Sequence, residues 1–445
     1  MRNKSFRGGV HPYDGKALSR DASIVRLEAK GDLVFLMNQH IGAPANPIVS
    51  VGDHVKKGQI IAEASGFVSA NIASSVSGTV KSIAPHLSQK GDSVLAITVE
   101  NDGKYETVDL YAKESDSRNM TDSDILELIK NAGIVGMGGA GFPTHVKLTV
   151  KEGVKIDYVI CNGAECEPYI TCDYRLMLER TYSAYIGMRI LLRLFGDARG
   201  VFAIESNKKD GIDAMRALVS RNERMSVVAM RPKYPQGGER VVINTVTGRR
   251  LKAGMLPADA GCIVVNFATL VAIAEAVSEG KALNRRIVTV TGDAIANPSN
   301  FDVPIGISLS ELIDAAGGFV KEPEKIILGG PMMGSAICDL DVPVTKTTSC
   351  ILCLAHDEIK QYSPLECIRC GKCLTVCPER LMPIKLKNAA DIGDYETFEK
   401  MHGLECIGCG SCTYICPSKR RLSPSITAAK QRIIAEKKRK AAMNK

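Results

Sequence analysis

The sequence predicts a multidomain α/β protein, and three observations carry this prediction. The chain has 445 residues, of which 45% are hydrophobic, so it is long enough for about three or more domains with cores of their own. Between residues 120 and 285 strand-like and helix-like segments alternate, which is typical of helices packed on a mostly parallel sheet. Eight of the fifteen cysteines form a duplicated run near the C-terminus, which indicates a separate cysteine-rich module.

Residues 1–110 comprise an N-terminal extension and a module of short strands broken by turns. Its segments VGDHVKKGQIIAEASGF and NIASSVSGTVKSI are similar to the two halves of a barrel-sandwich of the biotinyl/lipoyl type. The carrier lysine of such domains would lie near Phe67, and this chain has no lysine there. We therefore expect a packing module without a covalently attached carrier group.

Residues 120–285 predict a Rossmann-like α/β domain. Thr121 or Ser123 is expected to cap a first helix that ends at Gly133. One long helix is expected over residues 173–195, because its apolar positions recur at helical spacing. Buried strands are expected at IDYVICN, GVFAIES, MSVVAMR and CIVVN.

Three further segments follow along the chain. Residues 286–350 have a strand–turn–helix texture, which predicts a β-grasp unit in which a small sheet holds one helix. Residues 355–425 hold the cysteine runs, and the helix-like segment DIGDYETFEKMH between them predicts a helical two-cluster ferredoxin module. Residues 426–445 form a basic tail that predicts a short helix, with either a solvated face or a surface for anionic lipid or a partner protein.

The cysteine runs have the spacing of ligands to 4Fe–4S clusters. They consist of Cys367, Cys370, Cys373 and Cys377 in the first copy and Cys406, Cys409, Cys412 and Cys416 in the second, each followed by proline. Two-residue gaps let a tight loop hold three corners of a cube, while the fourth cysteine reaches the other cluster. Crossed ligation is therefore predicted, with Cys416 completing the first cube and Cys377 the second. Zinc is the alternative, but zinc sites usually show paired knuckles rather than triple runs.

The charge distribution argues against a nucleic-acid partner. Residues 430–445 contain seven Lys or Arg and one Glu, which gives +6 of the total +8 and leaves +2 for the rest. Proteins that bind nucleic acid build a basic face into the fold. The N-terminal residues contain no apolar stretch, so a signal peptide is not expected. No segment of eighteen apolar residues occurs, so a membrane-spanning helix is not expected either. Unpaired cysteines together with clusters favour a reducing setting.

Residues 134–148 form a glycine-rich loop with the sequence IVGMGGAGFPTHVKL. Such a loop leaves backbone N–H groups free to hold a phosphate or a flat ring. A tight turn before a helix explains the same glycines equally well. The dinucleotide-binding fingerprint should follow a strand, whereas a helix precedes this loop.

Four segments in this order resemble the NADH-oxidising flavoprotein subunit of respiratory complex I. The segments GMGGAGFPTHVKL, CNGAECEP, YPQGGER and VNFATL are similar to GRGGAGFPTGLKW, CNADESEPG, YICGEET and NNVETL of that family. With the N-terminal FRGGVHP, the barrel-sandwich, an SLBB-like β-grasp unit and two cluster runs, the whole chain resembles the RnfC family, the C subunits of Rnf ion-translocating electron-transport complexes.

This resemblance implies a site for non-covalent FMN with NAD(H) stacked above it. Beneath FMN would lie Gly136, Gly138, Gly139 and Gly141, with Lys147 near its phosphate or the nicotinamide. Asn162 and Glu165 would bond the flavin edge, and Asn266 and Thr269 would hold the phosphate side. Phe142, Tyr234 and the candidate catalytic residues Glu167 and Glu239 would face NADH. The chain departs from the flavoprotein pattern at residues 163, 164, 166, 238 and 267, so contacts there do not transfer by residue type.

The resemblance further implies an NAD-linked oxidoreductase subunit that passes electrons between NADH, FMN and two 4Fe–4S clusters. FMN is suited to this because it accepts a hydride and releases electrons singly, as a cube requires. Implied partners are the membrane subunits of an Rnf-type complex and a ferredoxin-linked electron pathway coupled to ion movement. The expected location is peripheral, on the cytoplasmic side of the cell membrane. The alternatives are a soluble NADH-dependent diaphorase subunit of a hydrogenase or formate dehydrogenase, and a scaffold that only carries clusters.

Overall fold

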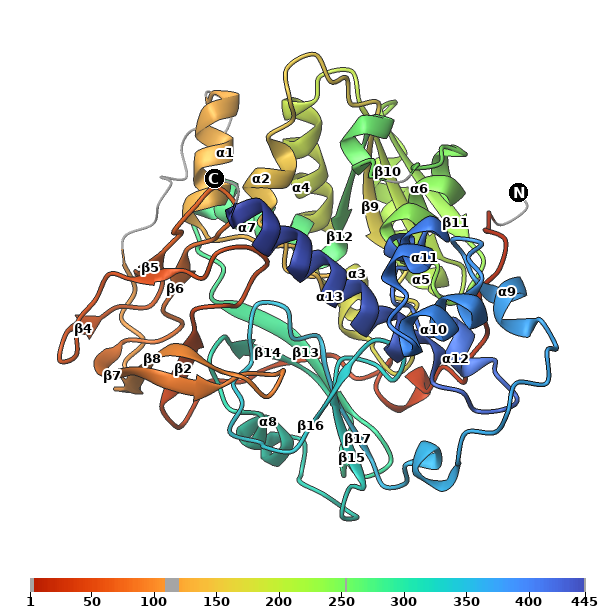
Figure 1. Cartoon of the computed structure of the whole chain (residues 1–445). Helices are drawn as coiled ribbons and strands as arrows, with labels where there is room; N and C mark the ends of the chain where they lie inside the picture. The colour runs from red at the N-terminus through yellow and green to blue at the C-terminus, as the bar shows by residue number, and fades with distance from the viewer. Residues whose placement is uncertain (1–3, 109–119, 253, 444–445) are drawn as a thin grey trace.

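The computed structural model describes residues 4–108, 120–252 and 254–443, which form four modules (Figure 1). We name them the barrel module (residues 28–108), the α/β domain (120–284), the grasp module (285–354) and the cysteine module (358–443). An N-terminal segment with a short helix η1 (Lys16–Leu18) precedes them. This arrangement confirms the predicted multidomain α/β class.

The barrel module consists of short strands in two small antiparallel sheets. One sheet has the order β2 (Leu33–Leu36), β8 (Ser93–Asn101), β7 (Gly78–Leu87) and β4 (His54–Val55), and the other has β3 (Asn46–Pro47), β5 (Ile60–Glu63) and β6 (Ile72–Ala73). Phe35, Ile61 and Ile97 are fully buried in its core. Phe67, at the position where a carrier lysine would lie, is 72% exposed. The barrel-sandwich prediction is confirmed.

The α/β domain is built on a parallel sheet with the order β11-β10-β9-β12. The strands are β9 (Tyr158–Gly163), β10 (Arg199–Glu205), β11 (Met225–Met230) and β12 (Cys262–Asn266). The helices are α1 (Asp122–Asn131), α2 (Thr144–Leu148), α3 (Cys172–Glu179), α4 (Thr181–Leu194), α5 (Lys209–Val219), α6 (Glu239–Thr247), η2 (Pro257–Ala260) and α7 (Phe267–Glu279). The chain runs outward from β9 to β11 and then returns to the other side of β9 as β12. This reversal makes a switch point, and open α/β sheets bind ligands at the carboxyl ends of the strands there.

The first helix begins and ends as predicted. Thr121 accepts a hydrogen bond from Asp124 N at 3.2 Å, and the Asp124 carboxylate accepts one from Thr121 N at 2.7 Å. This reciprocal pair is a capping box, which satisfies two otherwise unpaired backbone donors. Gly133 follows the helix in the left-handed region with φ of 66°.

The prediction of a single long helix over residues 173–195 is wrong, because two helices occupy this range. Arg180 has φ of −132° and separates α3 from α4, and its guanidinium bonds Glu275 at 2.8 Å and Asp302 at 3.0 Å. The break gives α4 its own direction against α7. The two helices cross closely at Gly187 of α4, where a Cβ would lie 2.1 Å from the Leu270 carbonyl oxygen of α7. Helical periodicity in the sequence does not signal such a crossing.

The grasp module contains a sheet with the order β1-β14-β13-β17-β15-β16. Its elements are β1 (Ile24–Arg26), β13 (Arg285–Thr291), β14 (Ser299–Pro304), α8 (Leu309–Ala315), β15 (Lys325–Leu328), β16 (Ser335–Ile337) and β17 (Cys350–Leu354). The predicted sheet with one helix is confirmed. Strand β1 comes from the N-terminal extension and pairs in parallel with β14, so this part of the extension belongs to the grasp sheet rather than to the barrel module.

The cysteine module is helical, as predicted. It contains η3 (Glu358–Gln361), α9 (Lys372–Val376), α10 (Pro383–Asp391), α11 (Tyr395–Lys400), η4 (Gly403–Glu405), α12 (Ser411–Tyr414) and α13 (Leu422–Met443). The expected boundary at residue 426 falls inside α13, which crosses the front of the molecule in Figure 1. Ile426, Ala429 and Ile433 of α13 are buried in one core with Leu386 and Phe398. The first half of the helix therefore packs as part of the module and is not a free tail.

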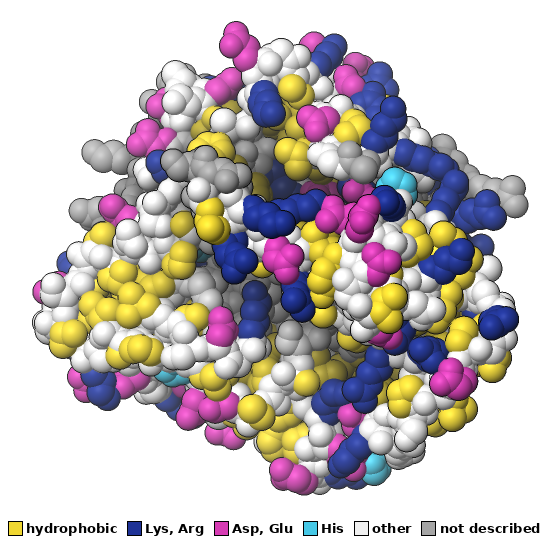
Figure 2. All heavy atoms as spheres, viewed as in Figure 1, with side chains coloured by type: hydrophobic (Ala, Val, Ile, Leu, Met, Phe, Trp, Pro, Cys, Tyr) yellow, Lys and Arg dark blue, Asp and Glu magenta, His cyan; other side chains and the backbone are white. Residues whose placement is uncertain are grey.

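The face over which α13 runs carries charges of both signs. Figure 2 shows Lys and Arg side chains interspersed with Asp and Glu side chains there. Lys430 donates to the Cys406 carbonyl oxygen at 2.8 Å, and Lys437 is paired with Glu399. Part of the basic charge that the sequence assigns to the tail is thus used inside the cysteine module.

Lys346 joins three modules at one buried point. It is 1% exposed, and its ammonium donates to the carbonyl oxygens of Asn71 in the barrel module and Gly133 after α1, the latter at 2.6 Å. Its backbone N–H donates to Gln39 Oε1 at 3.1 Å. Burial lowers the pKa of Lys346 from its ordinary value of 10.5 to about 7.

This pKa predicts a pH-dependent stability. Between about pH 7 and about pH 10 the unfolded chain binds a proton at Lys346 that the folded chain has lost, so the folded state gains stability as the pH rises. Relative to a Lys346→Met variant, which has no such proton, the wild type should gain up to about 1.4 kcal/mol per pH unit in this window. Thermal unfolding of both proteins across the window tests this, and a difference that does not change with pH contradicts it.

Candidate functional site

The glycine-rich loop meets the sheet at its switch point. Asn162 and Asn266 lie opposite each other in register at the carboxyl ends of β9 and β12. A Cβ at Gly138 would lie 3.4 Å from Asn266 Cβ, so the loop rests against that side chain. Met137 N donates to Thr269 Oγ1 at 3.0 Å. The structure therefore brings four expected site residues together where an α/β sheet binds its ligand.

The loop is packed at its ends and open in its middle. Gly136 N donates to Phe142 O at 2.8 Å, and Gly141 N donates to Gly136 O at 3.1 Å. Gly139 is exposed with φ of 109°, and a Cβ there would meet no atom of the described residues within 4 Å. A backbone without side chains facing open space fits a flat ring or a phosphate lying directly on it.

Lys147 and Glu239 form an ion pair at the accessible edge of this site. Lys147 Nζ on α2 lies 2.8 Å from Glu239 Oε1 at the start of α6 and 3.0 Å from the Val264 carbonyl oxygen. Their side chains are 28% and 41% exposed. Pairs this exposed contribute little to stability, so a charged ligand can compete for either partner.

Two buried carboxylates lie next to Asn266. Asp173 Oδ2 accepts from Asn266 Nδ2 at 2.6 Å, and Glu165 Oε1 accepts from Asp173 N at 2.7 Å. Asp173 Oδ1 and Glu165 Oε2 are buried without a hydrogen-bond partner among the described residues, although Lys16 Nζ lies 3.7 Å from the latter. Burial raises the pKa of Glu165 to about 7 and also raises that of Asp173. Orphaned acceptors of this kind require an explanation, and a bound group with N–H or O–H donors supplies one.

Sequence reasoning included Glu165 but missed Asp173 and Lys16. In the sequence, Asp173 is an ordinary acid in the first turn of a helix, a position that needs no further role. Lys16 lies about 150 positions before its partners Glu165 and Ile170, and no local pattern signals a contact of that kind. Both become visible only through the tertiary fold.

The side chains of two residues expected to face NADH contact the grasp module and the cysteine module. Glu167 Oε1 accepts hydrogen bonds from Met332 N at 2.7 Å and Met333 N at 3.0 Å, in the turn between β15 and β16. Tyr234 is 2% exposed, and its hydroxyl donates to the Cys409 carbonyl oxygen at 2.7 Å. Both side chains are used in contacts with the grasp and cysteine modules, and the expected NADH contacts of Glu167 and Tyr234 stay predictions. Glu239 keeps a position from which it can reach a ligand.

Residues 234–238 connect the site around the glycine loop with the cysteine module. Asn162 Nδ2 donates to Gly237 O at 2.8 Å, and Gly237 N donates to Cys166 Sγ at 3.2 Å. On the other side, a Cβ at Gly238 would lie 3.6 Å from Ile407 Cδ1 in the second cysteine run. Burial raises the pKa of Cys166 to about 12, which fits a packed thiol rather than a reactive one.

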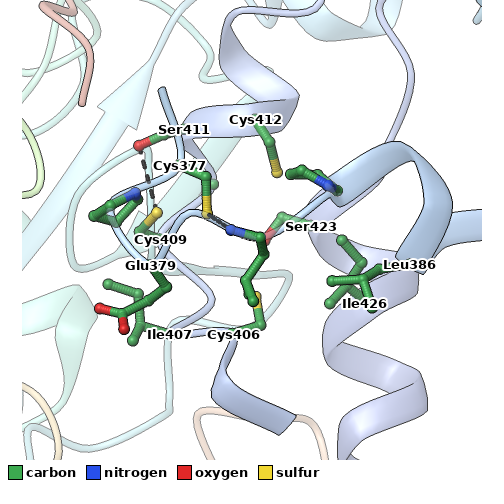
Figure 3. Close-up of a pocket in the computed structure, with 14 residues that line it drawn as sticks. Cys377, Glu379, Leu386, Cys406, Ile407, Cys409, Ser411, Cys412, Ser423 and Ile426 are labelled. Atoms are coloured by element: carbon green, nitrogen blue, oxygen red, sulfur yellow. Dashed lines mark hydrogen bonds between the residues drawn. The ribbon is translucent and has the colours of Figure 1, made fainter. Parts of the chain in front are cut away.

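One cavity in the cysteine module gathers four of the expected cluster ligands (Figure 3). Cys377, Cys406, Cys409 and Cys412 line it, and their sulfur atoms face a common space. Cys377 comes from the first run and the other three from the second, which is the crossed set that the spacing predicts. Burial raises the pKa of Cys377 to about 11 and that of Cys412 to about 12, and binding of iron as thiolates would release their protons.

The remaining four cysteines lie nearer the surface. Cys367 and Cys370 are exposed, and Cys373 and Cys416 are half-buried. Burial raises the pKa of Cys373, and the nearby thiols of Cys416 and Cys370 raise it further, which places Cys416 beside the first run. Within the described ranges no group of three or more His, Cys, Asp or Glu is spaced for a single metal ion. A cube binds each thiolate through a different iron, so its ligands stand farther apart than those of one ion.

Arg240 links the start of α6 to both cysteine loops. Its guanidinium bonds Glu379 at 3.4 Å and also bonds Glu405. Glu379 follows Cys377 by two residues, and Glu405 directly precedes Cys406. The first turn of α6 therefore carries a negative charge, Glu239, that pairs with Lys147, which follows the glycines of the loop. It also carries a positive charge, Arg240, that pairs with glutamates beside the cysteine cavity.

Family models match the chain in four stretches that follow this architecture. They are the RnfC barrel sandwich hybrid domain over residues 4–104, the Nuo51 FMN-binding domain over 129–275, the SLBB domain over 287–336 and a 4Fe-4S dicluster domain over 359–417. The C subunit of the Na(+)-translocating ferredoxin:NAD(+) oxidoreductase complex of Acetobacterium woodii is 41% identical over 99% of both chains. The chain belongs to the RnfC family.

Two further relatives support this membership. The C subunit of the proton-translocating ferredoxin:NAD(+) oxidoreductase complex of Clostridium ljungdahlii is 44% identical over 86% of this chain and 84% of the relative. The C subunit of the ion-translocating oxidoreductase complex of Rhodobacter capsulatus is 40% identical over 90% and 78%. No helix in the described part of this RnfC-family chain is long and apolar enough to span a membrane.

A solved structure shares part of the fold at much lower identity. It is the crystal structure of an NAD+-reducing [NiFe]-hydrogenase in the air-oxidized state, with a TM-score of 0.50 at 19% identity. The match covers 64% of this chain and 54% of the hydrogenase chain. Similarity at this level shows a common fold alone, so the diaphorase alternative gains no support against the RnfC relatives.

The cysteine geometry predicts which cube each ligand serves. Cys377→Ser should remove the cube bound by Cys406, Cys409 and Cys412 and leave the other in place, because Cys377 lines their cavity. Iron per chain should fall from about eight to about four, as expected for losing one of two 4Fe–4S clusters. Iron analysis with low-temperature paramagnetic resonance checks this. Cys416→Ser is the matched control, and loss in Cys377→Ser of the cube bound by Cys367, Cys370 and Cys373 would show that ligation is not crossed.

Proposed function

We propose that this RnfC-family chain exchanges electrons with NADH at an FMN bound over residues 136–141 and passes them singly to two 4Fe–4S clusters. NADH loses a hydride that reduces FMN together with one proton, and two cubes then take one electron each while two protons leave the flavin. The observation that carries the proposal is the joining of both sites through residues 234–240. Asn162 and Lys147 of the flavin site contact this segment on one side, and Cys409 and Glu405 of the cysteine module contact it on the other.

The residues of the α/β domain have separate tasks in this proposal. Gly138 and Gly139 leave the space in which the ring lies, and Asn162 and Asn266 border it at the strand ends. Lys147 supplies a positive charge for a phosphate and Glu239 lies beside it for the nicotinamide nucleotide. Glu165 and Asp173 accept hydrogen bonds from the ring side, which would satisfy their orphaned oxygen atoms.

The two cubes differ in their surroundings, and this suggests their order. The cube of Cys377, Cys406, Cys409 and Cys412, here called the inner cube, lies against Tyr234 and Arg240 of the α/β domain. The cube of Cys367, Cys370, Cys373 and Cys416, the outer cube, has two exposed ligands. We assign the inner cube to exchange with the flavin and the outer cube to exchange with a partner.

The surface around the outer cube fits an acidic electron-transfer protein of the same complex. Ile359 in η3 is 63% exposed, and Leu365 and Ile368 in the loop between η3 and α9 are 66% and 67% exposed. This loop runs along the outer edge of the molecule (Figure 1). Residues 359–374 also contain three Lys or Arg against one Glu. Apolar contact with basic surroundings favours a partner that is acidic around its own redox centre. Attachment to the cytoplasmic face of a membrane would follow from this contact, with the exposed basic end of α13 assisting.

The flavin site predicts an effect of filling the open loop. Gly139→Val should lower flavin content and NADH:ferricyanide activity, because a side chain there occupies the space that the ring needs. Gly153→Val is the control, since Gly153 also has positive φ and no described neighbour within 4 Å of its Cβ position. Flavin fluorescence after release from the protein measures the content. Wild-type flavin content in Gly139→Val, with full turnover, would refute the placement.

Substitutions on the surface around the outer cube should lower electron transfer only in the assembled complex. Leu365→Glu and Ile368→Glu should leave NADH:ferricyanide activity intact but weaken exchange with the other proteins of the complex, because a carboxylate opposes both apolar contact and an acidic partner. Ile392→Glu is the control, since Ile392 is 79% exposed at the end of α10. The measurements are ferredoxin:NAD activity and the amount of this chain retained on membranes from cells that co-express the complex. Equal effects of all three substitutions would exclude this surface.

A further inference from the structure

The N-terminal residues 4–19, here called the strap, lie across the joint between the α/β domain and the cysteine module. At its beginning the strap extends the edge of the parallel sheet. Lys4 N donates to Ala229 O at 3.2 Å, and Arg231 N donates to Lys4 O at 2.8 Å. Lys4 Nζ also donates to Val246 O on α6 at 2.7 Å.

The middle of the strap contacts both sites at once. Val10 and Tyr234 exchange backbone hydrogen bonds of 2.8 and 3.0 Å, so the strap fixes the residue whose hydroxyl bonds the Cys409 carbonyl oxygen. One residue earlier, Gly9 N donates to Val376 O at 2.7 Å, directly before the inner-cube ligand Cys377. Val10, Tyr234, Val376 and Cys409 form one small buried core.

Two glycines make this contact sterically possible. Gly9 has φ of 77°, and a Cβ there would lie 2.5 Å from Tyr234 O. Gly8 has φ of 95°, and a Cβ there would lie 3.0 Å from Val376 O and 3.1 Å from Cys377 O. The strap backbone therefore lies directly against the backbone that carries Cys377, and a side chain at either glycine would displace its neighbours, more at Gly9 than at Gly8.

The end of the strap reaches the carboxylates beside the glycine loop. Tyr169 N donates to Asp14 O at 2.6 Å. Lys16 is 8% exposed, and its ammonium donates to Glu167 O at 3.0 Å and to Ile170 O and lies 3.7 Å from Glu165 Oε2. One short segment thus touches the flavin side, the connecting loop and the inner-cube loop.

We propose that the strap is a positioning element that sets the separation between the flavin and the inner cube. This inference rests on the proposed function, in which each transfer removes one electron from the flavin and adds it to one cube. The strap touches neither reacting centre in this proposal. It acts through Tyr234 and the Val376–Cys377 backbone, and displacing that backbone should slow the transfer while both cofactors stay bound.

A graded series of glycine variants tests the strap. Gly91→Ala is the control, because Gly91 has φ of 82° in the turn between β7 and β8, and in the described part of the chain no atom lies within 4 Å of its Cβ position. Gly8→Ala requires a small displacement of the Val376 and Cys377 carbonyls, and Gly9→Ala requires a larger one at Tyr234. All three introduce a side chain at positive φ, so only the contacts distinguish them.

The measurements separate the flavin from the inner cube. In anaerobic stopped-flow with NADH, reduction of the flavin and of ferricyanide should match the wild type in all three variants. Appearance of the reduced inner cube should be unchanged in Gly91→Ala, slower in Gly8→Ala and slowest in Gly9→Ala, by about tenfold, because small displacements of reacting centres are costly in rate. Amide hydrogen exchange of residues 370–380 should rise in the same order, which reports the contact independently of turnover.

The outcomes distinguish this inference from the proposed function. A wild type that reduces neither flavin nor cubes with NADH overturns the proposed function itself. A wild type that transfers normally, with Gly8→Ala and Gly9→Ala indistinguishable from Gly91→Ala, overturns the strap inference alone. If Gly9→Ala does not fold, Gly8→Ala decides the question, since its closest contacts are milder. Faster exchange of residues 370–380 without slower transfer also overturns it, because the strap would then only stabilise the fold.

Discussion

The contact between the α/β domain and the inner-cube loop is the constraint on which the other features depend. Electrons pass between two fixed cofactors, so the flavin site and the cube must be held at one separation. The hydrogen bond from the Tyr234 hydroxyl to the Cys409 carbonyl and the ion pairs of Arg240 provide this connection across the module boundary. Both residues belong to one segment that also borders Asn162. One segment of the α/β domain therefore contacts both sites.

The same region contains an unusual number of buried charges. Lys208 and Glu205 are 3% and 1% exposed and lie 3.6 Å apart, and burial lowers the pKa of the first and raises that of the second. Lys208 donates to Ala164 O at 2.7 Å, next to Glu165. Removing one member of such a set leaves an uncompensated charge, which costs more than the pair contributes. These charges fix the loop before Glu167 in one conformation, and a cofactor that binds by backbone contacts needs such a fixed frame.

Local patterns in the sequence predict the architecture and the cluster ligands. The duplicated cysteine run implies crossed ligation, and alternating strands and helices imply the parallel sheet that carries Asn162 and Asn266. What local patterns do not predict is the long-range contacts of particular side chains. Tyr234 and Glu167 lie in segments that resemble the flavoprotein pattern, but this chain has a cysteine module and a β15–β16 turn against them, and these contacts hold both side chains. The packing of the first half of α13 is not predicted from the sequence. The helix buries few residues, on one narrow side, and most of the residues around them are charged or polar.

The predicted crossed ligation explains how the N-terminus would act on the inner cube. The strap contacts Val376, which belongs to the first cysteine run, yet Cys377 lines the cavity of the second. If each run held its own cube, a contact at Val376 would bear on the outer cube, away from Tyr234. Because the fourth cysteine crosses over, the same contact bears on the cube nearest the α/β domain. The exchange of one ligand between the runs therefore lets a single backbone contact position the flavin side and the inner cube together.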